Sequence, residues 1–354
     1  MIALVTIAST KVKVKQTYAN KLVRILEFYV FILVARSVLF PTDVAFTTYI
    51  FSPYNVFFAL SPIVLLLPQI GFNMKYLNII VILTCLCGLI VGRPIGIAAF
   101  FCVLFFPFQK LSSAAKFVVV LSVVFDVMCA LGVVNLRDSP RSILLEIGAM
   151  MAMFTTIWVI NKESITKWYA RICFFLPILF VLSVFLYDSF ILSNLSRYIS
   201  NEELTVDTRT FLFLEISDNM ETPLDWLLGL GFNARYYSDY FFNSISEDAD
   251  FYLRSNVEVG ALQLILKGGI LLFLLQSLLL WYSVFYAIKN SNNRFCLSCA
   301  LFLASYFVLS FIVDFPSSNP IVVFFPWLCC GFCLSGEWLS KNDEEIKYLI
   351  NSKQ

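Results

Sequence analysis

The residues best suited to chemistry lie in one polar stretch, residues 192–256, and in the first residues after it. Arg254-Ser-Asn256-Val-Glu258 puts a guanidinium, an amide and a carboxylate within five residues, and Asp207-Thr-Arg209 places another carboxylate near an arginine. An arginine fork binds phosphate or carboxylate groups through paired N–H donors. A carboxylate can accept a proton from a reacting hydroxyl. These residue types suit anion binding and general base chemistry.

Histidine is absent from all 354 residues, which excludes Ser-His-Asp catalysis and His-ligated metals. The ten cysteines lie in apolar runs and none lies in the polar stretch, so we expect no disulfide framework. The C-x-x-C pairs Cys296/Cys299 and Cys330/Cys333 could indicate a metal or redox site, but small apolar residues of membrane helices explain them more simply. We therefore expect no metal and no cofactor.

The overall composition is that of a membrane protein. Hydrophobic residues make up 60% of the chain and charged residues 14%, whereas a soluble domain has about a quarter charged residues. The formal net charge of +1 gives no basic field for a nucleic-acid partner.

Apolar runs long enough to cross a bilayer recur along the chain and predict an all-α polytopic membrane protein with about ten spans. We place the spans at 24–41, 54–70, 76–92, 94–108, 117–134, 142–160, 172–191, 269–288, 295–313 and 320–337. The chain then divides into an N-terminal bundle of seven spans (1–191), an external loop with a half-helix (192–268), and three spans with a tail (269–354).

The basic residues predict the orientation. With both termini in the cytoplasm, 16 of the 25 basic residues lie inside, and 13 of these are Lys, as the positive-inside rule requires. Because Lys and Arg residues precede the first span, this span can itself direct insertion into the membrane, and we expect no cleavable signal peptide. Eight of the other nine are Arg, which suits an external face that binds anions; we expect about half of them to pair with loop carboxylates instead. These eight are Arg36, Arg93, Arg137, Arg141, Arg197, Arg209, Arg235 and Arg254.

The external loop is rich in aromatic residues, including Tyr236 and Tyr237. Their flat apolar faces and polar edges suit sugar rings, and they equally suit anchoring at the lipid interface. Leu228-Gly229-Leu-Gly231 permits a tight turn with close backbone approach.

The apolar run from Val257 to Ile288 is too long for one span. We predict a half-helix over 257–267, a break at Gly268-Gly269, and then the eighth span. The N-terminus of a half-helix attracts anions, and Arg254 lies just before it. Two readings of Glu258 remain open: a capping box with Ser255, or a functional carboxylate near the membrane face.

At these residues the sequence resembles the O-antigen polymerase (Wzy-type) family, within the wider group of O-antigen polymerases and ligases. The resemblance covers the architecture and rests on Asp207-Thr-Arg209, on Leu228-Gly-Leu-Gly231 with Tyr236-Tyr237, and on Arg254 to Gly260 running into Leu266-Lys-Gly-Gly269. Many members carry a His-Asn pair about eleven residues before a Gly that opens the next span. Here Glu258 stands at that distance from Gly269, so the sequence departs from the pattern.

The resemblance implies a membrane bundle like those of GT-C glycosyltransferases, at the periplasmic face of a Gram-negative inner membrane. It would transfer a growing glycan from undecaprenyl pyrophosphate to the non-reducing end of a second lipid-linked repeat unit, without a metal. Membrane lipid surrounds such an enzyme, and a chain-length regulator and a flippase are implied partners.

The resemblance and the residue chemistry together assign roles. The pyrophosphate clamp would be Arg209 and Arg254, with Arg93 and Arg36 as further candidates; Arg36 interrupts the first span and must face a cavity or a partner. The base would be Glu258 or Asp207. Tyr236, Tyr237 and Asn256 would contact sugar.

Three other functions remain open. An O-antigen ligase has the same layout but transfers to lipid A-core. A lipid-linked oligosaccharide flippase or transporter should carry charges along its spans, where this chain has few, and shows inverted repeats, which are not visible here. A structural subunit of a polysaccharide complex is the third. The predicted spans contain Glu27, Arg36, Asp126, Glu146 and Asp188.

Overall fold

The computed structural model describes residues 17–39, 113–130, 140–160, 163–187, 210–238, 253–254, 256–312 and 320–351, with a few residues between 65 and 90. This part of the chain is mostly helical, with one two-stranded sheet, β1 (Tyr236–Tyr237) and β2 (Leu253–Arg254). The helical class predicted from the sequence is therefore confirmed for the described residues.

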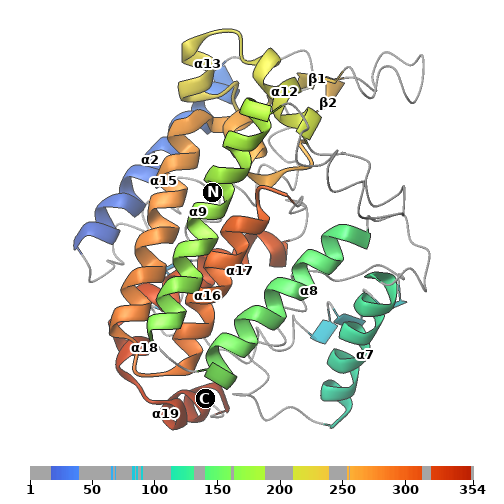
Figure 1. Cartoon of the computed structure of the whole chain (residues 1–354). Helices are drawn as coiled ribbons and strands as arrows, with labels where there is room; N and C mark the ends of the chain where they lie inside the picture. Colours follow the sequence, from blue (N-terminus) through green and yellow to red (C-terminus); the bar gives the residue numbers. More distant parts are fainter. Residues whose placement is uncertain are drawn as a thin grey trace.

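Helix α15 (Gly260–Asn290) is the centre of the fold. It packs against α2 (Thr17–Leu39), α9 (Glu163–Tyr187), α16 (Arg294–Leu309) and α17 (Pro320–Leu334). Its buried apolar side chains form a continuous core with those of α16 and α17. The three helices lie next to one another in the bundle (Figure 1).

A second group of helices lies to one side of this centre. Helix α8 (Pro140–Phe154) continues into a π-helical turn, η3 (Thr155–Ile160), and packs against both α16 and α7 (Ser113–Ala130). Tyr169 of α9 joins these groups, because its hydroxyl lies 2.7 Å from Ser305 Oγ on α16 and 3.4 Å from the Ala149 carbonyl on α8.

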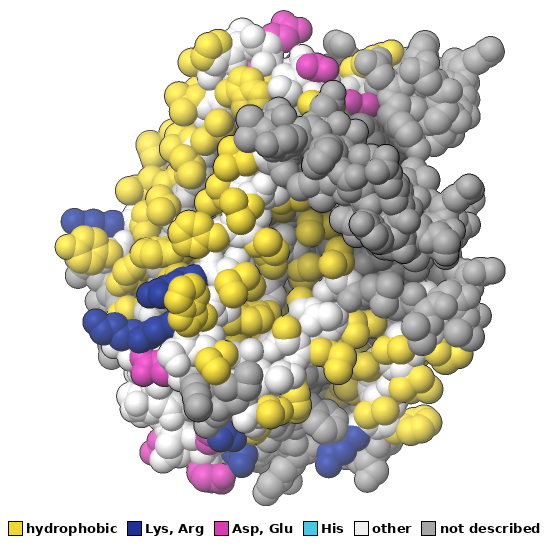
Figure 2. Space-filling view, in the orientation of Figure 1, with side chains coloured by type: hydrophobic (Ala, Val, Ile, Leu, Met, Phe, Trp, Pro, Cys, Tyr) yellow, Lys and Arg dark blue, Asp and Glu magenta, His cyan; other side chains and the backbone are white. Residues whose placement is uncertain are grey.

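Two described helices, Glu163–Leu182 within α9 and Gly260–Asn290, are long and apolar enough to cross a membrane. Helices also cover most of the described residues in the predicted spans 24–41, 117–134, 142–160, 295–313 and 320–337, although α9 begins nine residues before its predicted span, 172–191. The predicted spans 54–70, 76–92 and 94–108 lie almost wholly outside the described residues. Hydrophobic side chains cover much of the visible face over α9 and α15, with acidic side chains at its upper end (Figure 2).

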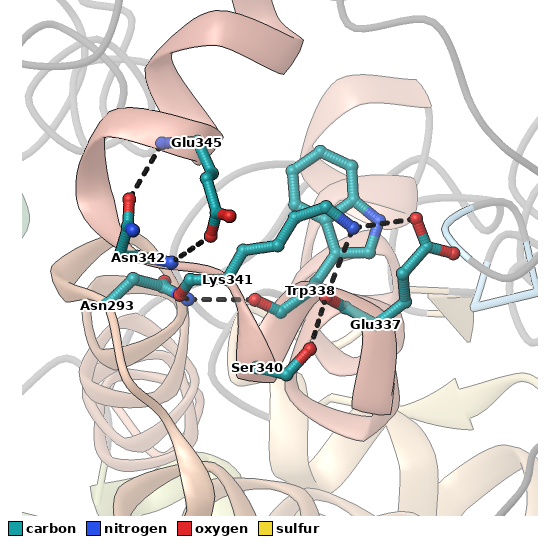
Figure 3. Close-up of polar contacts among 7 residues, drawn as sticks. All are labelled: Asn293, Glu337, Trp338, Ser340, Lys341, Asn342 and Glu345. Atoms are coloured by element: carbon teal, nitrogen blue, oxygen red, sulfur yellow. Dashed lines mark hydrogen bonds and ion pairs between the residues drawn. The ribbon is translucent and has the colours of Figure 1, made fainter.

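The end expected to be cytoplasmic is closed by the C-terminal helices α18 (Gly336–Ser340) and α19 (Asp343–Asn351). Buried Asn293 caps α16 by accepting from the Cys296 amide at 2.8 Å, and its Nδ2 donates to the carbonyls of Trp338 and Lys341 (Figure 3). Asn342 and Glu345 form a reciprocal cap at the start of α19. The tail is thereby joined to the helix bundle.

The opposite end carries the described part of the external loop: α12 (Thr210–Asn219), α13 (Pro223–Leu228) and the β1–β2 pair (Figure 1). Thr222 and Asp225 form a capping box that starts α13, with Pro223 at its first position. Asn219 bonds the backbone of Tyr237 at 2.9 and 3.0 Å, which holds α12 against β1.

Candidate functional site

The predicted break in the long apolar run is confirmed at Gly269. Its φ of 68° and ψ of −176° are not helical and separate a half-helix, Gly260–Gly268, from the rest of α15. A broken helix leaves carbonyls without their normal amide partners. Here Leu266 O accepts from Leu230 N at 2.8 Å, Lys267 O accepts from Gly231 N at 3.0 Å, and Gly268 O accepts from the Tyr29 hydroxyl at 2.8 Å.

The turn that supplies these donors has the glycines noted in the sequence. Gly229 has a φ of 69° and a ψ of 179°, a region open essentially only to glycine, and Gly231 has a φ of 97°. A Cβ on Gly229 would lie 2.5 Å from Gly268 N, and a Cβ on Gly269 would lie 2.5 Å from Gly229 N. We call this arrangement of Gly229, Gly268 and Gly269 the glycine interlock.

Helix α2 holds the same turn from the other side. Arg36 Nη1 donates to the Gly229 carbonyl at 2.8 Å, so the arginine that interrupts the first predicted span does face a protein partner. Ser37 Oγ accepts from Phe232 N at 3.0 Å, and Ser37 O accepts from Asn233 Nδ2. From α15, buried Lys267 donates to Phe232 O at 2.7 Å.

The other end of the half-helix carries the candidate chemical groups. Glu258 lies one residue before the N-cap, Val259, and its Oε1 is 3.1 Å from Arg254 Nη2. The Arg254 side chain is 25% exposed and that of Glu258 is 37% exposed, so a ligand can reach both. The structure brings together the two residues that the sequence singled out.

The helix does not start where the capping-box reading of Glu258 requires. The helix begins at Gly260 rather than near 257, so Glu258 precedes the helix instead of standing at its third position, and Val259 makes no side-chain cap. Gln263 holds the segment before the helix instead. Its Oε1 accepts from Val257 N at 2.7 Å and its Nε2 donates to Asn256 Oδ1 at 3.3 Å. The Ala261 amide bonds Ser310 O at 2.8 Å and is therefore not open to an anion.

Tyr236 faces Arg254 across the β1–β2 ladder, and its side chain is fully buried. Its ring therefore offers no exposed face to a sugar, unlike the neighbouring Tyr237, which is 39% exposed. Burial raises the pKa of Tyr236 to about 12; the Arg254 cation opposes this rise, while Glu215 and Glu258 add to it. The Tyr236 hydroxyl is thus neutral at physiological pH and close to three charged groups.

Glu215 completes this cluster and was not anticipated. Both of its carboxylate oxygens accept from Ser238 Oγ, at 2.8 and 2.9 Å. A carboxylate on a helix beside a Tyr-rich strand gave no distinctive signal in the sequence. Lys267 was also missed as a contact of the turn, although a charge inside an apolar run is a signal for a buried polar role.

The remaining predicted site residues, Arg93, Asp207 and Arg209, lie outside the described residues. Within the described parts of the chain, no group of three or more Cys, Asp or Glu could hold a metal. The described cysteines of both C-x-x-C pairs are buried in the helix core, where Cys333 Sγ approaches Cys296 O at 3.8 Å.

Comparison of the chain with protein-family models, with curated protein sequences and with solved structures finds no match.

Proposed function

We propose that this protein is an O-antigen polymerase of the periplasmic face of a Gram-negative inner membrane. Its donor is a growing glycan on undecaprenyl pyrophosphate, and its acceptor is the non-reducing end of a second lipid-linked repeat unit. The observation that carries the proposal is the accessible Arg254–Glu258 pair at the outer end of a broken, membrane-length helix. An anion-binding group and a candidate base therefore lie side by side where the lipid-linked pyrophosphate would lie.

The transfer assigns one role to each residue. Glu258 takes the proton of the acceptor hydroxyl as that oxygen bonds to the anomeric carbon of the donor glycan. The bond from this carbon to the pyrophosphate oxygen breaks at the same centre, and undecaprenyl pyrophosphate leaves with the electron pair. Arg254 stabilises the negative charge on the leaving group.

The ion pair itself fits this division of work. Arg254 Nη2 lies 3.1 Å from Glu258 Oε1, and the Glu258 side chain is 37% exposed, so a substrate hydroxyl can reach the carboxylate. A pyrophosphate oxygen that binds Arg254 competes with Glu258 for the guanidinium, and the released carboxylate is the stronger base. Arg209 and Asp207 remain the second candidates for clamp and base.

The contacts at the break favour an enzyme over a transporter. In transporters with discontinuous helices, unwound carbonyls coordinate the coupling ion near the middle of the membrane. Here the Leu266, Lys267 and Gly268 carbonyls bond to Leu230, Gly231 and Tyr29. These contacts occupy the break, and the accessible charged pair lies at the other end of the half-helix.

Deletion of the gene, followed by gel analysis of lipopolysaccharide, tests the proposal. We expect the deletion strain to carry a single repeat unit on the lipid A-core, and plasmid-borne wild type to restore the long-chain ladder. A core with no repeat unit identifies a ligase instead. Polymer formation by the purified full chain from lipid-linked repeat units separates an enzyme from a structural subunit.

The paired variants Arg254→Lys and Glu258→Gln then test the site within the same strain. Lys keeps the charge but removes the fork, and Gln keeps the shape but cannot accept a proton at neutral pH. We expect both to shorten the ladder strongly at wild-type expression. A full ladder from Glu258→Gln would remove Glu258 from the base role.

A further inference from the structure

The Tyr236 hydroxyl lies beside the Arg254–Glu258 pair and takes no part in the proton transfer or in the binding of the leaving group. The residue is 0% exposed, and its hydroxyl lies beside the Arg254 guanidinium without a fully formed hydrogen bond to it. A buried hydroxyl without a well-formed hydrogen bond is unfavourable, and phenylalanine would fill the same space without that penalty. The hydroxyl therefore calls for an explanation beyond packing.

The surroundings of the hydroxyl point to Arg254. Tyr236 and Arg254 are directly paired in the antiparallel ladder, and the Nη1 nitrogen of Arg254 is buried. The Arg254 cation is close enough to oppose the rise in the pKa of Tyr236. A neutral phenol oxygen can accept a hydrogen bond from a guanidinium N–H.

We propose that Tyr236 is a positioning residue, whose hydroxyl oxygen fixes the Arg254 guanidinium when pyrophosphate displaces Glu258 from it. This inference rests on the proposed function. In the resting state Glu258 holds Nη2 at 3.1 Å. Once the anion takes over that nitrogen, Tyr236 supplies the contact on the buried side and prevents the fork from rotating out of line.

The rest of the cluster is built to keep Tyr236 in place. Its backbone pairs with that of Arg254, and the next residue, Tyr237, is bonded through its backbone to Asn219 of α12. Ser238 is bonded to Glu215 on the same helix. A hydroxyl on a residue fixed in this way can set the position of the more exposed arginine next to it.

The test compares Tyr236→Phe with Tyr348→Phe, which removes an exposed hydroxyl from α19 at the opposite end of the molecule. The full chain in lipid nanodiscs is titrated with inorganic pyrophosphate, and its thermal stability is measured in parallel. We expect Tyr236→Phe to melt at or above the wild-type temperature and to bind pyrophosphate about tenfold more weakly, the loss of one charge-assisted hydrogen bond. Tyr348→Phe should match wild type in both.

A double variant shows whether Tyr236 acts through Arg254. In the Arg254→Lys background, Tyr236→Phe should weaken pyrophosphate binding by no more than about twofold, because the fork that it positions is gone. Equal losses in both backgrounds would overturn the inference, as would wild-type affinity in Tyr236→Phe, a lowered melting temperature, or no pyrophosphate binding by wild type.

The polymer ladder keeps this test separate from that of the proposed function. If wild type binds pyrophosphate and builds polymer while Tyr236→Phe does both normally, the positioning role fails and the polymerase proposal stands. If the deletion strain keeps its full ladder, the polymerase proposal fails, whatever the pyrophosphate titration gives.

Discussion

Replacing Gly269 with alanine tests whether the glycine interlock determines the stability of this fold. Gly269 has a φ of 68° and a ψ of −176°, and a new Cβ would press on the backbone of Leu227 as well as on Gly229 N at 2.5 Å. The opposing atoms belong to the backbone, so no side chain can rotate away from the added methyl group. The turn or the helix must shift instead.

The expected cost has two parts. An alanine in this region of φ and ψ costs about 1–3 kcal/mol. Overpacking against a fixed backbone adds about 1–3 kcal/mol. The sum, about 2–6 kcal/mol, is a large part of the about 5–15 kcal/mol that stabilises a typical folded domain. The Gly269→Ala substitution would also break the hydrogen bonds from Leu230 N and Gly231 N to the half-helix carbonyls.

Gly148→Ala on α8 is the matched control. A Cβ at Gly148 meets nothing within 4 Å, so the added methyl group is free of contacts. Alanine in a helix interior is favoured over glycine by about 0.5–1 kcal/mol. The two variants thus add the same methyl group to apolar helices and differ in the space and the backbone conformation that receive it.

Thermal unfolding in detergent measures the difference in melting temperature between the two variants. Size-exclusion chromatography checks that each variant is monodisperse. We expect Gly269→Ala to melt at least about 5 °C below wild type and Gly148→Ala to melt at or slightly above it. Equal melting temperatures for the two variants would refute the interlock. A pair of variants that both lose stability would mean that the helix contacts, rather than the interlock, dominate.

Three further predictions use the same protein. Ser37→Ala removes the hydroxyl that accepts from the buried Phe232 amide, so we expect a loss of about 1–3 kcal/mol in a denaturation assay, with exposed Ser340→Ala as the neutral control. Asn293→Ala removes a helix cap and two bonds to the C-terminal segment and should cost about 2–3 kcal/mol and increase proteolysis after α17. Arg36→Gln keeps a donor for Gly229 O but removes the charge; if Arg36 only holds the turn, polymer length stays unchanged, whereas a shorter ladder at normal stability places Arg36 in the pyrophosphate clamp.

The sequence predicted the features that depend on local pattern. An apolar run that is too long for one crossing, interrupted by paired glycines, predicts a broken helix, and the structure has the break at Gly269. Arg36 inside an apolar segment predicts a polar partner, and it bonds to Gly229 O. In both cases the residue type and the physical cost of its surroundings were sufficient evidence.

The contacts between distant segments could not be predicted in the same way. Tyr29 and Gly268 are 239 residues apart, and nothing near either residue indicates the other. The half-helix starts at Gly260 rather than at 257, where the apolar run begins, and Gln263 bonds the preceding backbone from within the helix. Tyr236 and Tyr237 are equivalent in the sequence, and only the pairing of β1 with β2 buries one and exposes the other.

The two ends of the half-helix differ: the end at the glycine interlock is fixed by hydrogen bonds, and the other end carries the accessible charged pair. At its C-terminal end, bonds from the turn and from α2 fix Gly260–Gly268 relative to the helix bundle. At its N-terminal end, the Arg254–Glu258 pair is accessible, with Arg254 Nη2 3.1 Å from Glu258 Oε1. In the proposed transfer this pair exchanges partners, which needs mobile side chains on a fixed backbone. A shift of the break would move both groups together, so a variant of the interlock that still folds should reduce polymer formation without touching either charged residue.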